Sequence, residues 1–343
     1  MIQAPLPNKP AMRPGAPLRI LMSSAGIAKL ADPVRDVLAG YPHEVLDSGT
    51  IEPGSGFEVA FVSRDVTAAS TKHEVMPSTQ RFHDLLRAAT PLRWVHTHSA
   101  GADRPVFVEL VRRGVTVTTS SGANAAVVAQ TAVAGVLALA RHLPQAMAAQ
   151  RERRWAPFGA GGLPRDLAGQ TAVVVGWGPV GRRIAAILSA IGLRCVAVRQ
   201  NAASDSDGFE TVGFDNLDGV LPRADWLLLA CPLTERTRGL VAAPALAQLP
   251  AGAHLVNVAR GEVVVQDDLI AALRAGRLAG AYLDVFEHEP LPPDSPIWHM
   301  ANVIVTPHTA GHSDGNEARV AAMFLENLSR WRDGETLLNR AGG

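Results

Sequence analysis

Cysteine is nearly absent from this 343-residue sequence: only Cys195 and Cys231 occur, each inside an apolar run. The chain shows none of the cysteine and histidine spacings typical of zinc sites, so we predict no bound metal. Two buried free thiols are typical of a protein in a reducing compartment. We therefore expect a cytoplasmic location.

An excess of either charge is also lacking, because 32 lysines and arginines balance 32 aspartates and glutamates. This balance gives no reason to expect nucleic acid or an anionic membrane as a partner. The most membrane-like run, Ala125–Ala140, is short and is interrupted by Gln130 and Thr131, so we predict a buried helix there. The proline-rich residues 1–16 predict a disordered lead-in rather than a signal peptide.

What the sequence does contain is a repeated alternation of short apolar strands with helices. Such alternation predicts an α/β protein with parallel sheets and flanking helices. A first set of strands is predicted at residues 19–22, 58–63, 93–99 and 114–120, with helices at 28–39 and 79–89. A second, larger set is predicted at residues 171–176, 195–198, 224–230, 253–258, 280–285 and 301–307.

Two long helices are the natural crossings between the two sets of strands. One is alanine-rich and is predicted from about Asn124 to about Arg151; the other closes the chain, from about Asp314 to Arg332. We therefore predict a split arrangement. One domain holds residues 17–122 and 312–343, and residues 123–311 form the other.

A glycine-rich turn follows the first strand of the second set. The sequence TAVVVGWGPVG places Gly176, Gly178 and Gly181 in the pattern G-x-G-x-x-G, directly after an apolar strand and before an amphipathic helix at 180–193. In a dinucleotide site these glycines permit the tight turn, the approach of the pyrophosphate and the close packing of helix on strand. The alternative is an ordinary strand–turn–helix in which the glycines are incidental.

Pro179 and Val180 open the helix that follows this turn. Proline suits the first helical turn, where its missing N–H is not needed. The remaining free N–H groups and the helix dipole favour a bound anion. The turn and the helix start together predict a dinucleotide-binding site.

Arg199 ends the next strand, where many dinucleotide-binding chains carry an acidic residue for the ribose 2′-hydroxyl. A carboxylate there would repel a 2′-phosphate, whereas an arginine can pair with one. We predict that NADP(H) is preferred and that NAD(H) is possible. The alternative is a solvent-facing arginine in an NAD enzyme.

Polar side chains gather where three predicted strands end. Arg260 follows one strand, Asp284, Glu287 and Glu289 follow another, and His308 follows a third. Ligands bind at this edge of parallel sheets. An arginine that holds a carboxylate, a histidine that donates a proton and a carboxylate that supports the histidine suit the reduction of a 2-keto acid. The alternatives are a solvated glutamate and a histidine with a purely structural role.

Several motifs, taken in order, closely resemble the D-isomer-specific 2-hydroxyacid dehydrogenases, nearest to their glyoxylate/hydroxypyruvate reductase branch. The motifs are SAGAD (99–103), GWGPVG (176–181), ACPLT (230–234), NVARG (257–261), LDVFEHEP (283–290) and TPHTAG (306–311). The resemblance implies a Rossmann-type dinucleotide domain inserted into a flavodoxin-like substrate domain.

The same resemblance implies a role for each matching residue. Arg260 matches the substrate-binding arginine, His308 the catalytic histidine, Glu289 its carboxylate partner, and Asp284 a residue that contacts the nicotinamide carboxamide. The loop implied to bind the substrate carboxylate contains Ala100 and Gly101. The nicotinamide pocket is implied to contain Cys231, Pro232, Val258 and Ala259. Pro179 stands where many members have a polar or basic residue.

The sequence features that bear on the substrate and on the oligomeric state are less specific than these motifs. His98 shares a predicted strand with His96 and is a candidate substrate-binding residue; a histidine bonded within its own domain is the alternative. Trp155 is similar to an aromatic residue that related reductases present to a partner subunit, which implies a homodimer. The predicted partner is a small molecule.

Three functions fit these features. The first is reduction of a small 2-keto acid to the D-hydroxy acid, as in glyoxylate/hydroxypyruvate reductases. The second is NAD-linked oxidation of a D-hydroxy acid or phosphoglycerate. The third is a non-catalytic dinucleotide-sensing protein, against which the intact set of Arg260, Glu289 and His308 argues.

Overall fold

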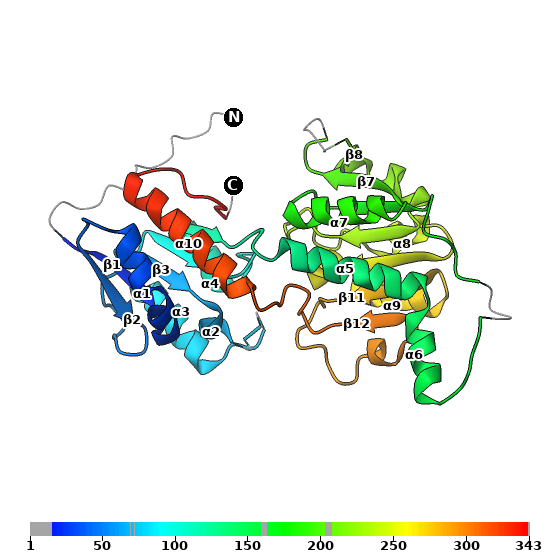
Figure 1. Cartoon of the computed structure of the whole chain (residues 1–343), viewed down its shortest axis with the longest axis horizontal. Coiled ribbons are helices and arrows are strands. Elements are labelled where there is room, and N and C mark those ends of the chain that lie inside the picture. Colours follow the sequence, from blue (N-terminus) through cyan, green and yellow to red (C-terminus); the bar gives the residue numbers. More distant parts are fainter. Residues whose placement is uncertain (1–15, 69, 72, 159–162, 203–207, 342–343) are drawn as a thin grey trace. The chain divides into compact units, whose positions relative to one another are not determined.

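A computed structural model describes residues 16–68, 70–71, 73–158, 163–202 and 208–341. The predicted lead-in therefore falls almost wholly outside the described residues. The chain divides into two compact units (Figure 1): Met1–Ala123 with Asp314–Gly343, and Asn124–Ser313. The chain thus leaves the first unit, builds the whole of the second, and returns.

The first unit is built on a five-stranded parallel sheet with the order β2-β1-β3-β4-β5, which is the flavodoxin-like order. Its strands are β1 (Leu18–Met22), β2 (His43–Asp47), β3 (Val59–Val62), β4 (Trp94–Thr97) and β5 (Thr116–Thr119). The sequence analysis missed β2. This edge strand buries only Leu46, so it lacks the apolar run that marked the other strands.

Helices cover both faces of this sheet (Figure 1). On one face, α1 (Ser24–Val37) and α10 (Asn316–Asp333) enclose a core that includes Ile20, Trp94 and Phe324. On the other face, α3 (Pro77–Ala88) and α4 (Pro105–Arg112) pack over Leu21 and Val95. The short α2 (Arg64–Thr67) follows β3. Neither α2 nor α4 was predicted.

The second unit is built on a seven-stranded parallel sheet with the order β12-β11-β10-β9-β6-β7-β8. The strands are β6 (Thr171–Val175), β7 (Arg194–Arg199), β8 (Glu210–Gly213), β9 (Trp226–Leu229), β10 (Ala253–Asn257), β11 (Leu278–Leu283) and β12 (Val303–Val305). In this order β7 and β8 lie on one side of β6, and β9 to β12 lie on its other side. The carboxyl end of β6 is therefore the switch point at which ligands bind in such sheets. The edge strand β8 was missed because it is short, has a single large apolar residue and buries none of its four residues fully.

Helices α5 (Ala125–Ala140) and α7 (Pro179–Ala190) cover one face of this sheet, and α8 (Ala243–Gln248) and α9 (Gln266–Arg274) cover the other. Strands β6 and β9 are buried along their whole length, which agrees with a sheet covered on both faces. Among the described residues, no single helix has both the length and the apolar character needed to cross a membrane. The bent pair of α5 and α6 (Leu143–Arg151) passes that test by length and composition.

The prediction of one long helix from Asn124 to Arg151 is wrong. The segment forms α5 and a separate α6 (Leu143–Arg151), and the two helices meet at a bend of 70°. His142 adopts a left-handed conformation with φ of 53°, and Pro144 lies in the first turn of α6. Proline cannot donate the N–H that a continuous helix needs there, and its ring clashes with the preceding turn.

Candidate active site

The glycine turn after β6 is as crowded as a dinucleotide turn requires. Gly176 has a φ of +104°, and a Cβ added there would lie 2.5 Å from the backbone nitrogen of Cys231. A Cβ on Gly181 would lie 1.9 Å from the carbonyl oxygen of Gly176. Gly176 also donates its N–H to the carbonyl of Val198 (2.8 Å). Only glycine fits at these two positions.

Gly178 differs, because a Cβ added there would meet nothing within 4 Å. It is the N-cap of α7, and Pro179 and Val180 form the first turn. The space beside Gly178 and the free amides at this helix start fit a pyrophosphate, whose charge the helix dipole stabilises. The residues present therefore fit the phosphates of a dinucleotide.

Arg199 lies at the end of β7, directly after the residue whose carbonyl holds Gly176. It pairs in register with Gly213 of β8. In the Rossmann arrangement this strand end lies near the adenosine ribose. The position is therefore right for recognition of the 2′ substituent.

The residues expected around the nicotinamide follow β9 and β10. Burial raises the pKa of the Cys231 thiol to about 12, so this group stays protonated and apolar at neutral pH. Val258 donates its N–H to Leu229 (3.1 Å), and Ala259 donates to the side chain of Asn257 (3.0 Å). The first bond joins the ends of β9 and β10, and the second shapes the turn that follows β10. Pro232 accepts from the hydroxyl of Thr237 (2.7 Å), which closes the turn after β9.

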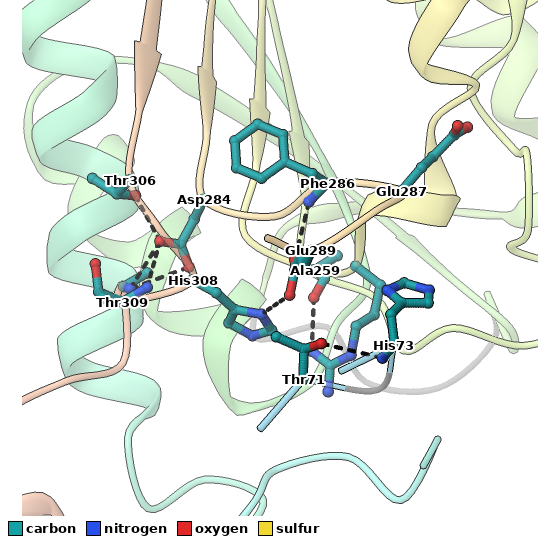
Figure 2. A network of polar contacts seen from close by, with 12 residues as sticks. Thr71, His73, Ala259, Asp284, Phe286, Glu287, Glu289, Thr306, His308 and Thr309 are labelled. Atoms are coloured by element: carbon teal, nitrogen blue, oxygen red, sulfur yellow. Dashed lines mark hydrogen bonds and ion pairs between the residues drawn. The ribbon is translucent and has the colours of Figure 1, made fainter. Parts of the chain in front are cut away.

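His308 and Glu289 form a hydrogen-bonded pair (Figure 2). The Nδ1 atom of His308 lies 2.8 Å from a carboxylate oxygen of Glu289, and the other oxygen accepts the N–H of Phe286 at 3.1 Å. The histidine side chain is 48% exposed, whereas that of the glutamate is 14% exposed. Because Nδ1 donates to Glu289, Nε2 is the nitrogen left to meet a ligand.

Two opposing effects act on the pKa of the Glu289 carboxyl. Burial by itself raises the pKa of the carboxyl, but the bond and charge of His308, the amide of Phe286 and the charge of Arg260 outweigh burial, so the pKa lies below its ordinary value. The carboxylate is therefore ionised at neutral pH and accepts the hydrogen bond from Nδ1 of His308. A lowered pKa means that this group stabilises the folded protein at neutral pH, and that the contribution is lost as the pH falls through the carboxyl's range.

Arg260 follows β10 and begins a short turn that brings two loops together. Its guanidinium donates to the carbonyl of Ala259 (2.8 Å), and Asn257 donates to the carbonyl of Arg260 (3.1 Å). A Cβ added to Gly261 would lie 1.8 Å from the carbonyl carbon of Phe286. Gly261 therefore lets the loop that carries Arg260 press against the loop that carries Glu289.

Of the three acidic residues after β11, only Glu289 contacts the histidine side chain. Glu287 instead accepts the N–H of Gln266 at 2.9 Å, at the start of α9, which is a capping role. Asp284 is 3% exposed, and its carboxylate accepts from the hydroxyl of Thr306 (2.6 Å) and the amide of Thr309 (2.8 Å). Figure 2 shows these bonds beside the His308–Glu289 pair.

A family model for the NAD binding domain of D-isomer specific 2-hydroxyacid dehydrogenases matches residues 133–310. A glyoxylate reductase of Korarchaeum cryptofilum is 35% identical over 254 residues, which cover 74% of this chain and 76% of that protein. The chain belongs to the D-isomer specific 2-hydroxyacid dehydrogenase family. The family resemblance seen in the sequence is thereby confirmed.

Two further relatives of this dehydrogenase are informative. A D-isomer specific 2-hydroxyacid dehydrogenase from Xanthobacter autotrophicus Py2, solved with NADPH and MES, is 30% identical, with a TM-score of 0.74, and the match covers 95% of this chain and 98% of that one. A D-3-phosphoglycerate dehydrogenase of Archaeoglobus fulgidus is 30% identical over 75% of this chain and 48% of that protein. This chain is thus an oxidoreductase that uses a nicotinamide dinucleotide.

The first unit of the dehydrogenase holds the remaining predicted site residues. His98 lies just past β4, and its Nε2 lies 2.8 Å from the hydroxyl of Thr67, so the structure shows the bond within its own unit that was the alternative. Burial, with the charges of Arg104 and Arg64, lowers the pKa of His98 to about 4. Ala100 and Gly101 lie in the loop after β4, where the hydroxyl of Ser99 donates to the carbonyl of Gly101 (2.7 Å).

Two residues beside the His308–Glu289 pair of the dehydrogenase were not predicted as site residues. Thr306 was noted only as part of a motif, and Tyr282 was not considered. The hydroxyls of these two residues lie 2.6 Å apart. Tyrosine and threonine are common in strands, so neither gives a signal before the strand ends are seen together.

Gly261 gives a prediction about this site. Gly261→Ala should destabilise the dehydrogenase by roughly 1–3 kcal/mol, because the new methyl group cannot fit beside Phe286. It should also lower kcat/KM, because Arg260 and Glu289 move apart. Gly219→Ala is the matched control, since a Cβ there meets nothing within 4 Å. Equal melting temperatures for the two variants would contradict the packing described.

Proposed function

We propose that the protein reduces a small 2-keto acid, of the glyoxylate or hydroxypyruvate type, to the D-2-hydroxy acid, with NADPH as the preferred cofactor. The observation that carries the proposal is the 2.8 Å bond between His308 and an ionised Glu289. A supported imidazolium with Nε2 turned to a ligand is the proton donor that ketone reduction needs.

Each residue has a role in this proposal. The bound nicotinamide supplies the hydride, while Gly176, Gly178, Pro179, Val180 and Gly181 hold the pyrophosphate. His308 gives its proton to the developing alkoxide, and Glu289 keeps the imidazole protonated and oriented. Arg260 binds the substrate carboxylate and polarises the ketone. The residues proposed to complete the substrate and nicotinamide sites are His98, Ala100, Gly101, Cys231, Pro232, Val258, Ala259 and Asp284.

The substrate class is supported by relatives named glyoxylate reductase. A panel of 2-keto acids, assayed with NADPH and with NADH, tests the proposal. We expect turnover of glyoxylate or hydroxypyruvate above that of ketones without a neighbouring carboxylate. Turnover of ketones that lack the carboxylate at equal rates would contradict the role given to Arg260.

A second candidate is NAD-linked oxidation of a D-hydroxy acid or of phosphoglycerate. The similarity to a D-3-phosphoglycerate dehydrogenase favours it. Assays with NAD⁺ and either 3-phosphoglycerate or D-lactate separate the two candidates. Oxidation that is faster than reduction under matched conditions would favour the second.

The cofactor preference is tested by changing Arg199. A charge-assisted contact contributes about 1.5–3 kcal/mol, or roughly 10–150-fold in affinity. We therefore expect the unaltered enzyme to favour NADPH over NADH by at least about tenfold in kcat/KM. Arg199→Asp should reverse this order, with little change in kcat at saturating cofactor. A preference for NADH in the unaltered enzyme, or equal effects on both cofactors, would show that Arg199 does not recognise the 2′-phosphate.

The support given by Glu289 is tested through pH. Glu289→Gln removes the carboxylate charge that favours the cationic form of the proposed proton donor. The alkaline side of the pH–rate profile for reduction should therefore move to lower pH. A profile that coincides with that of the unaltered enzyme would count against the pairing.

We also propose that the five-stranded unit is the substrate domain, that the protein forms a homodimer and that it is cytoplasmic. Support for a dimer comes from exposed apolar side chains on α6 and beyond: Leu143, Met147, Trp155 and Leu163. Trp155 is 95% exposed and Leu163 82% exposed, and apolar side chains that gather on a surface mark association sites. Light scattering at several concentrations tests the dimer.

The proposed cytoplasmic location is supported by the free thiols of Cys195 and Cys231, which are buried and suit a reducing compartment.

A further inference from the structure

The loop that carries His308 is bound to one residue through three consecutive backbone amides. The N–H of His308 donates to the carbonyl of Asp284 (2.8 Å), and the N–H groups of Thr309 and Ala310 donate to its carboxylate (2.8 and 3.0 Å). Figure 2 shows the carboxylate of Asp284 facing this loop. Nearly the whole turn is therefore fixed by a single buried residue at the end of β11.

His308 needs such a hold because its backbone is strained. Its φ is 53°, in the left-handed region that residues other than glycine rarely adopt. A conformation of this kind persists only where the surrounding structure imposes it, and it is common at functional sites. The amides bound to Asp284 impose it here, and so aim the imidazole at Glu289.

The orientation of Asp284 depends in turn on a hydroxyl chain behind it. Thr306 donates to the same carboxylate oxygen that accepts the two loop amides (2.6 Å). Since the threonine proton is used there, the hydroxyl of Tyr282, 2.6 Å away, donates to Thr306. Burial and the charge of Asp284 outweigh this bond and raise the pKa of Tyr282 to about 12, so the phenol keeps its proton.

Tyr282 has little freedom to move. It is 3% exposed, and a Cβ added to Gly135 of α5 would lie 2.5 Å from its ring. The main chain of Thr306 is also fixed, because its N–H donates to the carbonyl of Leu283 (3.0 Å). The chain of hydroxyls therefore runs from a rigid helix–sheet contact to the loop of His308.

We propose that Thr306, backed by Tyr282, is a positioning residue for His308: the hydroxyl chain fixes Asp284, and Asp284 holds the strained turn that aims the imidazole. This inference rests on the proposed function, because it assigns the aim of the proton donor. It gives neither Thr306 nor Tyr282 a contact with substrate or cofactor. Misplacement of a catalytic group by about 1 Å can cost on the order of 10²-fold in rate.

The test uses Thr306→Val and Thr306→Ser in the full-length protein. Valine keeps the shape but loses the hydroxyl, so kcat should fall by roughly 10–100-fold, while KM for the keto acid changes little. The melting temperature should fall modestly, because the buried hydroxyl of Tyr282 loses its acceptor. Serine keeps the hydroxyl and should restore most of the activity. Tyr282→Phe should show a smaller loss of the same kind. Thr50→Val is the control, because that hydroxyl serves only a surface turn of the first unit.

A second readout does not depend on turnover. The proton shared by His308 and Glu289 should give a downfield NMR resonance that is absent from His308→Ala, weakened in Thr306→Val and retained in Thr306→Ser. If the unaltered protein reduces no 2-keto acid, the proposed function fails, and this resonance alone decides the positioning role. The inference is overturned if Thr306→Val keeps the resonance, or keeps kcat while the unaltered protein is active.

Discussion

Replacing His308 by alanine should lower kcat for ketone reduction by roughly 10²–10⁴-fold, the range that a general acid contributes. The reason is that the variant loses the proposed proton donor, an imidazole bonded through Nδ1 to an ionised carboxylate. Cofactor affinity should stay unchanged, because His308 lies after β12, whereas the glycine turn follows β6. Steady-state kinetics and a fluorescence titration of the reduced cofactor measure the two quantities.

His299→Ala is the matched control, since His299 is an exposed histidine of the same unit and precedes β12. It should keep full activity. If His308→Ala turns over within about threefold of the unaltered enzyme, far less than a general acid contributes, His308 is not the proton donor. In that case the pair with Glu289 is structural.

Gly176→Ala should abolish measurable dinucleotide binding and destabilise the second unit. Its φ of +104° disfavours any side chain, and the methyl group would lie 2.5 Å from the backbone nitrogen of Cys231. The turn and the contact between β6 and β9 must both shift. Cofactor titration and thermal unfolding should therefore both report a large loss.

Gly178→Ala separates the two effects. A Cβ there meets nothing within the protein, so the melting temperature without cofactor should match that of the unaltered protein. The methyl group would instead stand where the pyrophosphate approaches, and affinity should fall by at least about tenfold, or about 1.4 kcal/mol. Unchanged affinity in Gly178→Ala would mean that the phosphates do not lie against this turn.

The parts of the site that could be predicted are those that depend on short, local sequence patterns. A glycine turn between an apolar strand and a helix has a fixed geometry, and Gly176 and Gly181 have the conformation and crowding that it demands. Polar residues after buried strands meet at one edge of a parallel sheet, so His308 could be placed near the acidic residues that follow β11. The family resemblance then singled out Glu289 as its partner, and the structure shows the bond between them.

Most of the parts that could not be predicted depend on contacts between segments that are distant in the sequence, and no single residue type indicates such contacts. The break between α5 and α6 is an exception, because Pro144 in the first turn of α6 is a local signal that was overlooked. Edge strands β2 and β8 are held by their neighbours rather than by an apolar pattern. The strained φ of His308 and the hydroxyls of Thr306 and Tyr282 acquire meaning only once β11 and β12 lie side by side.

The central claim is that the protein moves a hydride between a nicotinamide and C2 of a 2-keto acid, with His308 as the proton donor. The most direct measurement uses NADPH deuterated at the transferable position of the nicotinamide, with glyoxylate and hydroxypyruvate as substrates. We expect one deuterium at C2 of the product and, from hydroxypyruvate, the D-hydroxy acid alone. A product without deuterium at C2, or one with the L configuration, would contradict it.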